Sequence, residues 1–92
     1  MNIHFYANFR QIVGGKTIEL DVPAGPTLHD LISILVNRFP ALGPAMTAES
    51  GQLLPFIHLF VNGRDAQFLP DGFATRIAPT DKIDIFPPVA GG

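Results

Sequence analysis

The chain has 92 residues, a formal net charge of −2, 47% hydrophobic residues and no cysteine. This length suits one domain with a single modest core, too small for a deep enclosed active site, and the lack of cysteine excludes disulfides and thiolate metal sites. The weakly acidic composition excludes the basic surface of a nucleic-acid-binding domain. Because no apolar run could cross a membrane and no signal peptide is apparent, we expect a cytoplasmic protein.

Two strands and a helix are expected in the first half of the chain. Apolar and polar residues alternate over residues 3–8 and again over residues 18–22, as in half-buried strands. The Gly14-Gly15 pair between them predicts a hairpin turn. Thr27 is expected to cap a helix, with Asp30 in a capping-box-like position. The helix is expected to present one apolar stripe, formed by Leu28, Leu31, Ile32, Leu35, Val36 and Phe39.

Mostly strands are expected in the second half of the chain. Residues 56–61 form a nearly continuous apolar run, and residues 82–86 are expected to form the last strand. The Asn62-Gly63 pair predicts a tight turn that leads into a short return strand over residues 64–68. Residues 41–46 predict a short helical turn. Two strands, a helix and then two or three strands indicate an α+β domain, with one main helix packed on one face of a mixed sheet.

The chain ends on Phe86-Pro87-Pro88-Val89-Ala90-Gly91-Gly92. Because neither proline has a backbone N–H, the last strand is expected to end near Phe86, which divides the chain into a domain over residues 1–86 and an extended, flexible tail over residues 87–92. Six extended residues reach roughly 20 Å at about 3.3 Å per residue, enough to enter the active site of another protein. Glycine has no Cβ, so Gly91 and Gly92 suit a narrow channel. We therefore interpret the α-carboxylate of Gly92 as the reactive group.

That carboxylate must be activated before it can react, most simply as an acyl-adenylate. The segment Gly14-Gly15-Lys16-Thr17 superficially resembles the end of a P-loop. However, the first glycine of that motif would fall on Arg10, and the segment is expected to be a hairpin turn. The three histidines also lack metal-ligand spacing. We therefore expect this chain to bind no cofactor or metal, and a partner enzyme to use the ATP.

The tail resembles that of the MoaD/ThiS-type sulfur carriers, a family that includes the small subunit of molybdopterin synthase. The opening Phe5-Tyr6-Ala7, Arg10 and the segment Val61-Asn62-Gly63-Arg64-Asp65 are similar to this family as well. The resemblance implies a ubiquitin-like β-grasp fold. It also implies that an E1-like enzyme adenylates Gly92, which becomes a thiocarboxylate that donates sulfide.

The implied partners are an E1-like adenylating enzyme and the large subunit of molybdopterin synthase or another sulfur-accepting enzyme. By itself the chain is not expected to be a complete enzyme. Three alternatives stay open: a carrier for cysteine or thiamine-thiazole synthesis, a ubiquitin-like protein modifier, and an interaction module with an inert tail. The stretch from Phe68 to Thr75 also resembles the carrier that delivers sulfide for cysteine synthesis.

A docking face for partners is predicted from strand parity. If Ile83 and Ile85 face the helix, Phe86 lies on the opposite face, and exposed aromatics there are candidate anchors. Tyr6 is expected on the same face by the same parity. Instead of being a docking anchor, Tyr6 could be an ordinary residue of an amphipathic strand. Phe86 could instead fold against the edge of the sheet. The remaining partner-binding candidates follow Phe86 directly and are Pro87, Pro88, Val89 and Ala90. Asp81 and Asp84 are interpreted as solvated carboxylates.

Overall fold

The computed structural model describes residues 1–22 and 25–88. In chain order the helices and strands are β1 (Asn2–Phe5), α1 (Phe9–Val13), β2 (Thr17–Glu19), α2 (Leu28–Arg38), α3 (Leu42–Met46), β3 (His58–Val61), β4 (Arg64–Asp65) and β5 (Ile83–Phe86). Two short 3-10 helices, η1 (Ala66–Phe68) and η2 (Gly72–Ala74), lie between β4 and β5.

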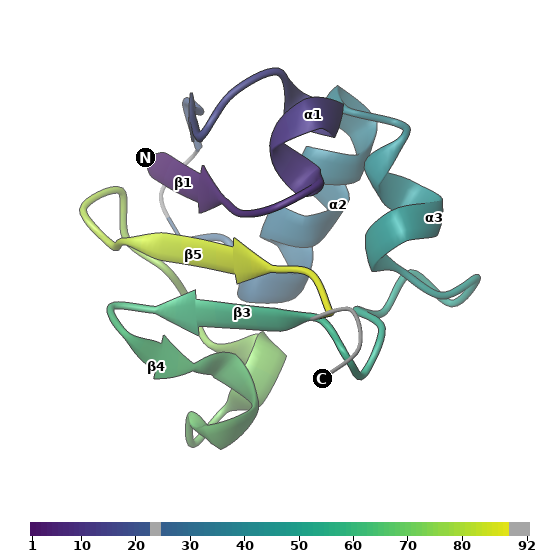
Figure 1. Ribbon diagram of the computed structural model, residues 1–92. Helices are drawn as coiled ribbons and strands as arrows, with labels where there is room; N and C mark the ends of the chain where they lie inside the picture. The colour runs from purple at the N-terminus through teal and green to yellow at the C-terminus, as the bar shows by residue number, and fades with distance from the viewer. Residues whose placement is uncertain (23–24, 89–92) are drawn as a thin grey trace.

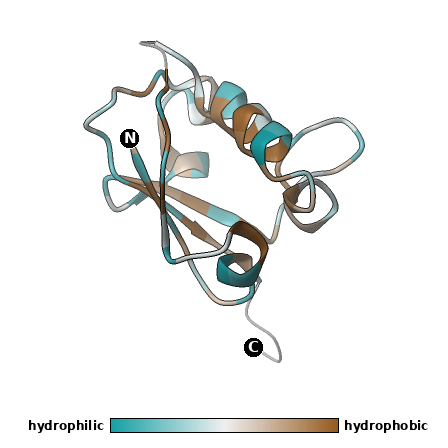
Figure 2. Ribbon diagram, turned by 90° about the horizontal axis from the view of Figure 1, so that it is seen from above, coloured by the Kyte–Doolittle hydropathy of each residue, from teal (hydrophilic) through white to brown (hydrophobic). Residues whose placement is uncertain are grey.

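The five strands form one mixed sheet in the order β2-β1-β5-β3-β4 (Figure 1). The central strand β5 runs parallel to β1 and antiparallel to β3, whereas the β1–β2 and β3–β4 pairs are antiparallel. Helix α2 lies on one side of this sheet and carries both hydrophobic and hydrophilic residues along its length (Figure 2). The expected architecture, one main helix on a mixed sheet, is therefore confirmed.

The hydrophobic core lies between α2 and the face of the sheet that α2 covers. Ile83 and Ile85 of β5 are both fully buried there, which is the condition under which strand parity places Phe86 on the opposite face. The other core residues with no exposed surface are Ile3, Phe5, Leu28, Leu31, Leu35, Leu42, Met46 and Ala66. Because the core draws on both layers, burial of these side chains is the main force that holds α2 against the sheet.

The start of α2 is the predicted capping box. The Asp30 backbone N–H donates to Thr27 Oγ1 over 3.1 Å, and the Thr27 N–H donates to Asp30 Oδ2 over 3.0 Å. These two bonds satisfy N–H groups that have no partner within the helix. At the other end, Arg38 is the last helical residue, and Pro40 follows closely.

The prediction of a hairpin turn at Gly14-Gly15 was wrong. The first strand ends at Phe5, and α1 fills the connection to β2. Gly14 caps α1 in the left-handed region, with φ 85°, a conformation that glycine adopts without steric cost. The helix forms here because Phe9 and Val13, one turn apart, both enter the core. A helix of 5 residues is too short to produce a clear periodicity in the sequence.

The return strand is also shorter than predicted. The Asn62-Gly63 turn forms as expected, with φ 52° and 85°, the positive values that a type I′ hairpin turn requires. After it, β4 spans only Arg64–Asp65, because Asp65 Oδ1 accepts the Gln67 N–H over 3.1 Å and caps η1. Phe68, at the end of η1, is 74% exposed.

Candidate functional site

Three aromatic rings gather on the face of the sheet that α2 does not cover. The rings of Tyr6 and Phe86 are stacked, with centroids 4.1 Å apart and planes 16° from parallel. The ring of Phe60 meets Phe86 edge-on, at 5.4 Å and 78°. Strand pairing explains the arrangement: His58 lies beside Phe86, and Phe60 lies two residues further along β3. We call Tyr6, Phe60 and Phe86 the aromatic patch.

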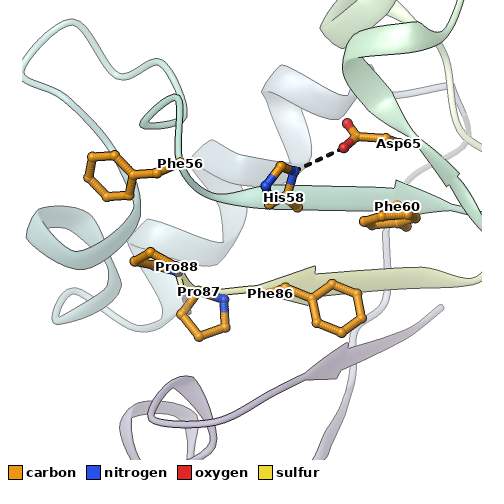
Figure 3. Close-up of a pocket in the computed structure, with 7 residues that line it drawn as sticks. All are labelled: Phe56, His58, Phe60, Asp65, Phe86, Pro87 and Pro88. Carbon is orange, nitrogen blue, oxygen red and sulfur yellow. Dashed lines mark hydrogen bonds and ion pairs between the residues drawn. The ribbon is translucent and has the colours of Figure 1, made fainter. Parts of the chain in front are cut away.

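An open apolar groove of about 570 Å³ adjoins the aromatic patch. Figure 3 shows Phe56 and the two prolines at one end of it, His58 in the middle and Phe60, Phe86 and Asp65 at the other end. Pro87 is buried and Pro88 is exposed. Because both prolines line the groove, it extends to the point where the chain leaves the sheet.

A carboxylate is buried at the patch. The Tyr6 hydroxyl donates to Asp84 Oδ1 over 2.8 Å, and Lys82 Nζ lies 3.9 Å from Asp84 Oδ2. The interpretation of Asp84 as a solvated residue was therefore wrong: it is 6% exposed. The side chain does point away from the core, but Tyr6, which lies 78 residues away in the sequence, closes over it.

The environment of Tyr6 favours its neutral form. The hydrogen bond to Asp84 is the main reason that the pKa of Tyr6 is raised above its ordinary value, and burial and the charge of Asp84 add to it. The Arg10 guanidinium opposes this shift; its central carbon lies 5.3 Å from the centre of the Tyr6 ring. Arg10 Nε also donates to the Phe5 carbonyl over 2.9 Å, which ties α1 to the end of β1.

A second polar pair borders the groove. His58 Nδ1 lies 3.0 Å from Asp65 Oδ2 (Figure 3). Although burial of the Asp65 carboxyl opposes it, hydrogen bonds from Gln67 and His58 hold the pKa of Asp65 below its usual range. Asp65 is thus a charged acceptor that connects β3 to η1 at the edge of the groove.

The structure brings four of the predicted site residues together: Tyr6, Phe86, Pro87 and Pro88. The other four, Val89, Ala90, Gly91 and Gly92, lie outside the described residues. Sequence reasoning did not identify Phe56, Phe60 or His58 as site residues, and it interpreted Asp84 as a solvated carboxylate. The parity of β3 could have placed Phe60 and His58 on the open face, but only the pairing of β3 with β5 shows that they lie beside Phe86.

The segment that resembles a P-loop has a different role. Gly14 ends a helix, and Lys16 leads into β2, whereas a P-loop connects a strand to a helix. Among residues 1–22 and 25–88, no three His, Asp or Glu side chains gather to hold a metal ion. No helix in the described part of the chain has the length and apolarity to span a bilayer.

Known relatives and structures agree with this architecture. Over 92 residues the chain is 35% identical to small archaeal modifier protein 3 of Haloferax volcanii, covering 100% of this chain and 98% of the relative. It is 37% identical over 71 residues to the sulfur carrier protein CysO of Mycobacterium tuberculosis, 75% of each protein. The crystal structure of SAMP1 from Haloferax volcanii matches with a TM-score of 0.85 and 28% identity, covering 99% of this chain and 97% of that chain.

A chain of the Amycolatopsis orientalis BexX/CysO complex matches with a TM-score of 0.79 and 27% identity, covering 99% of this chain and 98% of that chain. The fold is therefore the ubiquitin-like β-grasp shared by small sulfur carriers and modifiers. A model described as the ThiS family matches residues 3–92. The chain belongs to this family.

Proposed function

We propose that this protein is a sulfur carrier whose reactive group is the α-carboxylate of Gly92. An E1-like enzyme joins the carboxylate to AMP from ATP and releases pyrophosphate. A sulfur donor then displaces AMP and leaves a thiocarboxylate, whose sulfur attacks the acceptor. Hydrolysis of the resulting acyl bond restores the carboxylate. Gly91 and Gly92 suit this role because no side chain hinders their entry into a partner's active site.

The observation that carries this proposal is the extent of the family match, which runs from Ile3 to Gly92 and so includes both the folded domain and the tail. The aromatic patch and its groove supply a second argument. They lie on the open face of the sheet and end at Pro87 and Pro88, the first two residues of the tail. A partner that docks on this surface would be in reach of Gly92.

For the acceptor, we propose first the large subunit of molybdopterin synthase, because residues 86–92 resemble the ending of the small subunit of that enzyme. An acceptor in cysteine synthesis is supported as well by the 37% identity to CysO over 71 residues, and one in thiazole synthesis by the match to the ThiS family. Association of the purified chain with each candidate acceptor would separate these pathways.

The proposal is tested by intact mass spectrometry. The chain is incubated with a cognate E1-like enzyme, ATP and a sulfur donor, and we expect one oxygen to be replaced by sulfur at the C-terminal residue. A variant without Gly92 and a reaction without ATP serve as controls and should stay unchanged. Failure of the complete reaction with several cognate activating enzymes would contradict the sulfur-carrier function.

A second candidate function is protein modification, in which a substrate lysine rather than a sulfur donor attacks the activated Gly92. The specific observation in its favour is the 35% identity to a small archaeal modifier protein over the whole chain. Isopeptide-linked remnants of this tail on lysines of other proteins would support it. Cells that carry out sulfur transfer with the chain but contain no such conjugates would argue against it.

A further inference from the structure

The buried carboxylate of the docking face has a position that the fold itself does not require. Asp84 is the one charged side chain that is buried among the described residues, and it lies in the central strand. Its neighbours Ile83 and Ile85 enter the core, so Asp84 points to the opposite face. Burial of a carboxylate costs free energy unless the charge is paired and hydrogen-bonded, and an apolar residue would cover the sheet here without that cost.

The contacts of Asp84 indicate what it does. One carboxylate oxygen accepts the Tyr6 hydroxyl over 2.8 Å, and the other lies 3.9 Å from Lys82 Nζ. Hydrogen bonds to charged groups are shorter and stronger than those between neutral groups, and they are directional. The bond to Tyr6 therefore fixes the far end of the tyrosine side chain above the middle of the sheet.

Tyr6 needs such a fixed point because it lies beyond the regular part of β1. The strand ends at Phe5, and the chain then turns through Ala7, with φ 53°, into α1. The ring is stacked on Phe86, and the Arg10 guanidinium lies over it. Stacked rings can slide over one another, whereas a hydroxyl bound to a carboxylate cannot move without breaking the bond.

Fixing Tyr6 also fixes the place where the tail begins. Its ring covers Phe86, the last residue of β5, and Pro87 follows immediately. Phe86 is held from its other side by the edge-on ring of Phe60. The sequence of contacts thus runs from Asp84 to Tyr6, from Tyr6 to Phe86, and from Phe86 to the two prolines of the groove.

We propose that Asp84 is a positioning residue: by accepting the Tyr6 hydroxyl, it holds the aromatic patch in one arrangement, ready for the enzyme that activates the tail. This inference rests on the proposed sulfur-carrier function and adds a residue that need not touch the reacting atoms. It assigns Asp84 an effect on the recognition of the chain rather than on the chemistry at Gly92.

The test compares four variants of the full chain: Asp84→Ala, Asp84→Asn, Tyr6→Phe and the double variant of Asp84→Ala with Tyr6→Phe. Pyrophosphate release by the cognate E1-like enzyme gives KM for the carrier and kcat. We expect Asp84→Ala and Tyr6→Phe each to raise KM roughly 3- to 10-fold, as for loss of one hydrogen bond, with kcat almost unchanged. Asp84→Asn keeps an acceptor oxygen and should restore most of the affinity.

The double variant should be no worse than either single variant, because both remove the same bond. Glu49→Ala, which removes an exposed acidic side chain from the turn between α3 and β3, is the matched control and should leave KM unchanged. Fluorescence can report the mobility of the Tyr6 ring directly, because Tyr6 is the only tyrosine and the chain has no tryptophan. Tyrosine fluorescence anisotropy should fall in Asp84→Ala and recover in Asp84→Asn.

Three results would overturn the positioning role: an unchanged KM in Asp84→Ala, additive effects in the double variant, or an Asp84→Asn chain as weak as Asp84→Ala. Circular dichroism melts identify any variant that fails to fold, and Asp84→Asn, which keeps the size and the acceptor, then decides the question. Failure of the wild-type chain to be adenylated is a different result: it contradicts the proposed function, whereas normal adenylation with an unchanged KM in Asp84→Ala contradicts only this inference.

Discussion

At the scale of single residues, the open face of the sheet depends on pairs between residues that are far apart in the sequence. Strand parity correctly put the side chain of Asp84 on the face away from the core. It could not reveal that Tyr6, from the other end of the chain, covers that carboxylate and donates to it. Whether a polar residue on a strand is solvated therefore depends on long-range contacts, which a single sequence does not contain.

We expect the hydroxyl of Tyr6 to titrate above the ordinary tyrosine pKa of about 10. The hydrogen bond to Asp84, burial and the nearby negative charge all favour the neutral form and raise the pKa. The free energy of unfolding that this hydrogen bond contributes is present in full below the pKa of Tyr6 in the unfolded chain. It is lost as pH rises through the higher pKa of Tyr6 in the folded chain. Ultraviolet absorbance reports this titration directly, since there is one tyrosine.

In the same titration Asp84→Ala should shift the midpoint down toward that of the unfolded chain in urea. The Glu49→Ala variant should titrate as the wild type does. A wild-type midpoint at or below that of the urea-unfolded chain would show that the hydrogen bond between Tyr6 and Asp84 does not persist in solution.

Asp65 is expected to stabilise the fold at neutral pH but not in acid. Its pKa is lowered, since hydrogen bonds from Gln67 and His58 outweigh the effect of burial. The free energy of unfolding that Asp65 contributes is therefore present above the pKa of about 3.9 that its carboxyl has in the unfolded chain. It is lost as pH falls through the lower pKa of Asp65 in the folded chain. In urea unfolding at neutral pH, Asp65→Asn should cost about 1 kcal/mol. A difference from the wild type that persists in strong acid would contradict this assignment.

At the scale of elements, the sequence predicted best where local signals and packing agree. The helix α2 has a capping box, one apolar stripe and a proline after its end, and it forms as expected. The helix α1 was missed because 5 residues carry no measurable periodicity. The last strand was expected to end near Phe86, and β5 does end there. The groove could not be foreseen, because it requires the pairing of β3 with β5 and the position of Phe56.

Loss of the capping box should destabilise the whole domain, because α2 covers the core. Thr27→Ala removes the acceptor for the Asp30 N–H, and we expect it to lower the free energy of unfolding by about 1 kcal/mol. Ser33→Ala, at an exposed position of the same helix, is the control for a general effect of alanine. Urea denaturation followed by circular dichroism measures both. Equal stabilities of the two variants would mean that the cap contributes nothing in solution.

At the scale of the whole molecule, the hydrophobic core and the proposed docking surface lie on opposite faces of one sheet. The buried hydrophobic residues of the described chain lie between Ile3 and Ile85 in the sequence and form one core cluster with contributions from both strands and helices. The aromatic patch and the groove lie on the other face, next to the exit of the tail. Substitutions on the open face should therefore change docking with little effect on folding, and changes at Gly91 and Gly92 should affect neither.

The last consequence concerns a chain shortened by Gly91 and Gly92. Because the core lies within residues 3–85, the free energy of unfolding of the shortened chain should stay within about 0.5 kcal/mol of the wild-type value. It lacks the glycine that we propose is adenylated, so it should not react, yet it keeps the proposed docking face. We therefore expect it to inhibit adenylation of the wild-type chain competitively, with an inhibition constant close to the KM of the wild type.

The same shortened chain with Asp84→Ala should inhibit more weakly, by the factor that this substitution adds to KM in the full-length chain. Initial rates of pyrophosphate release at several carrier concentrations measure both constants. If the shortened chain folds but does not compete, the enzyme recognises the tail rather than the sheet. If it competes equally well with and without the Asp84 carboxylate, docking uses the open face but does not depend on the arrangement that Asp84 holds.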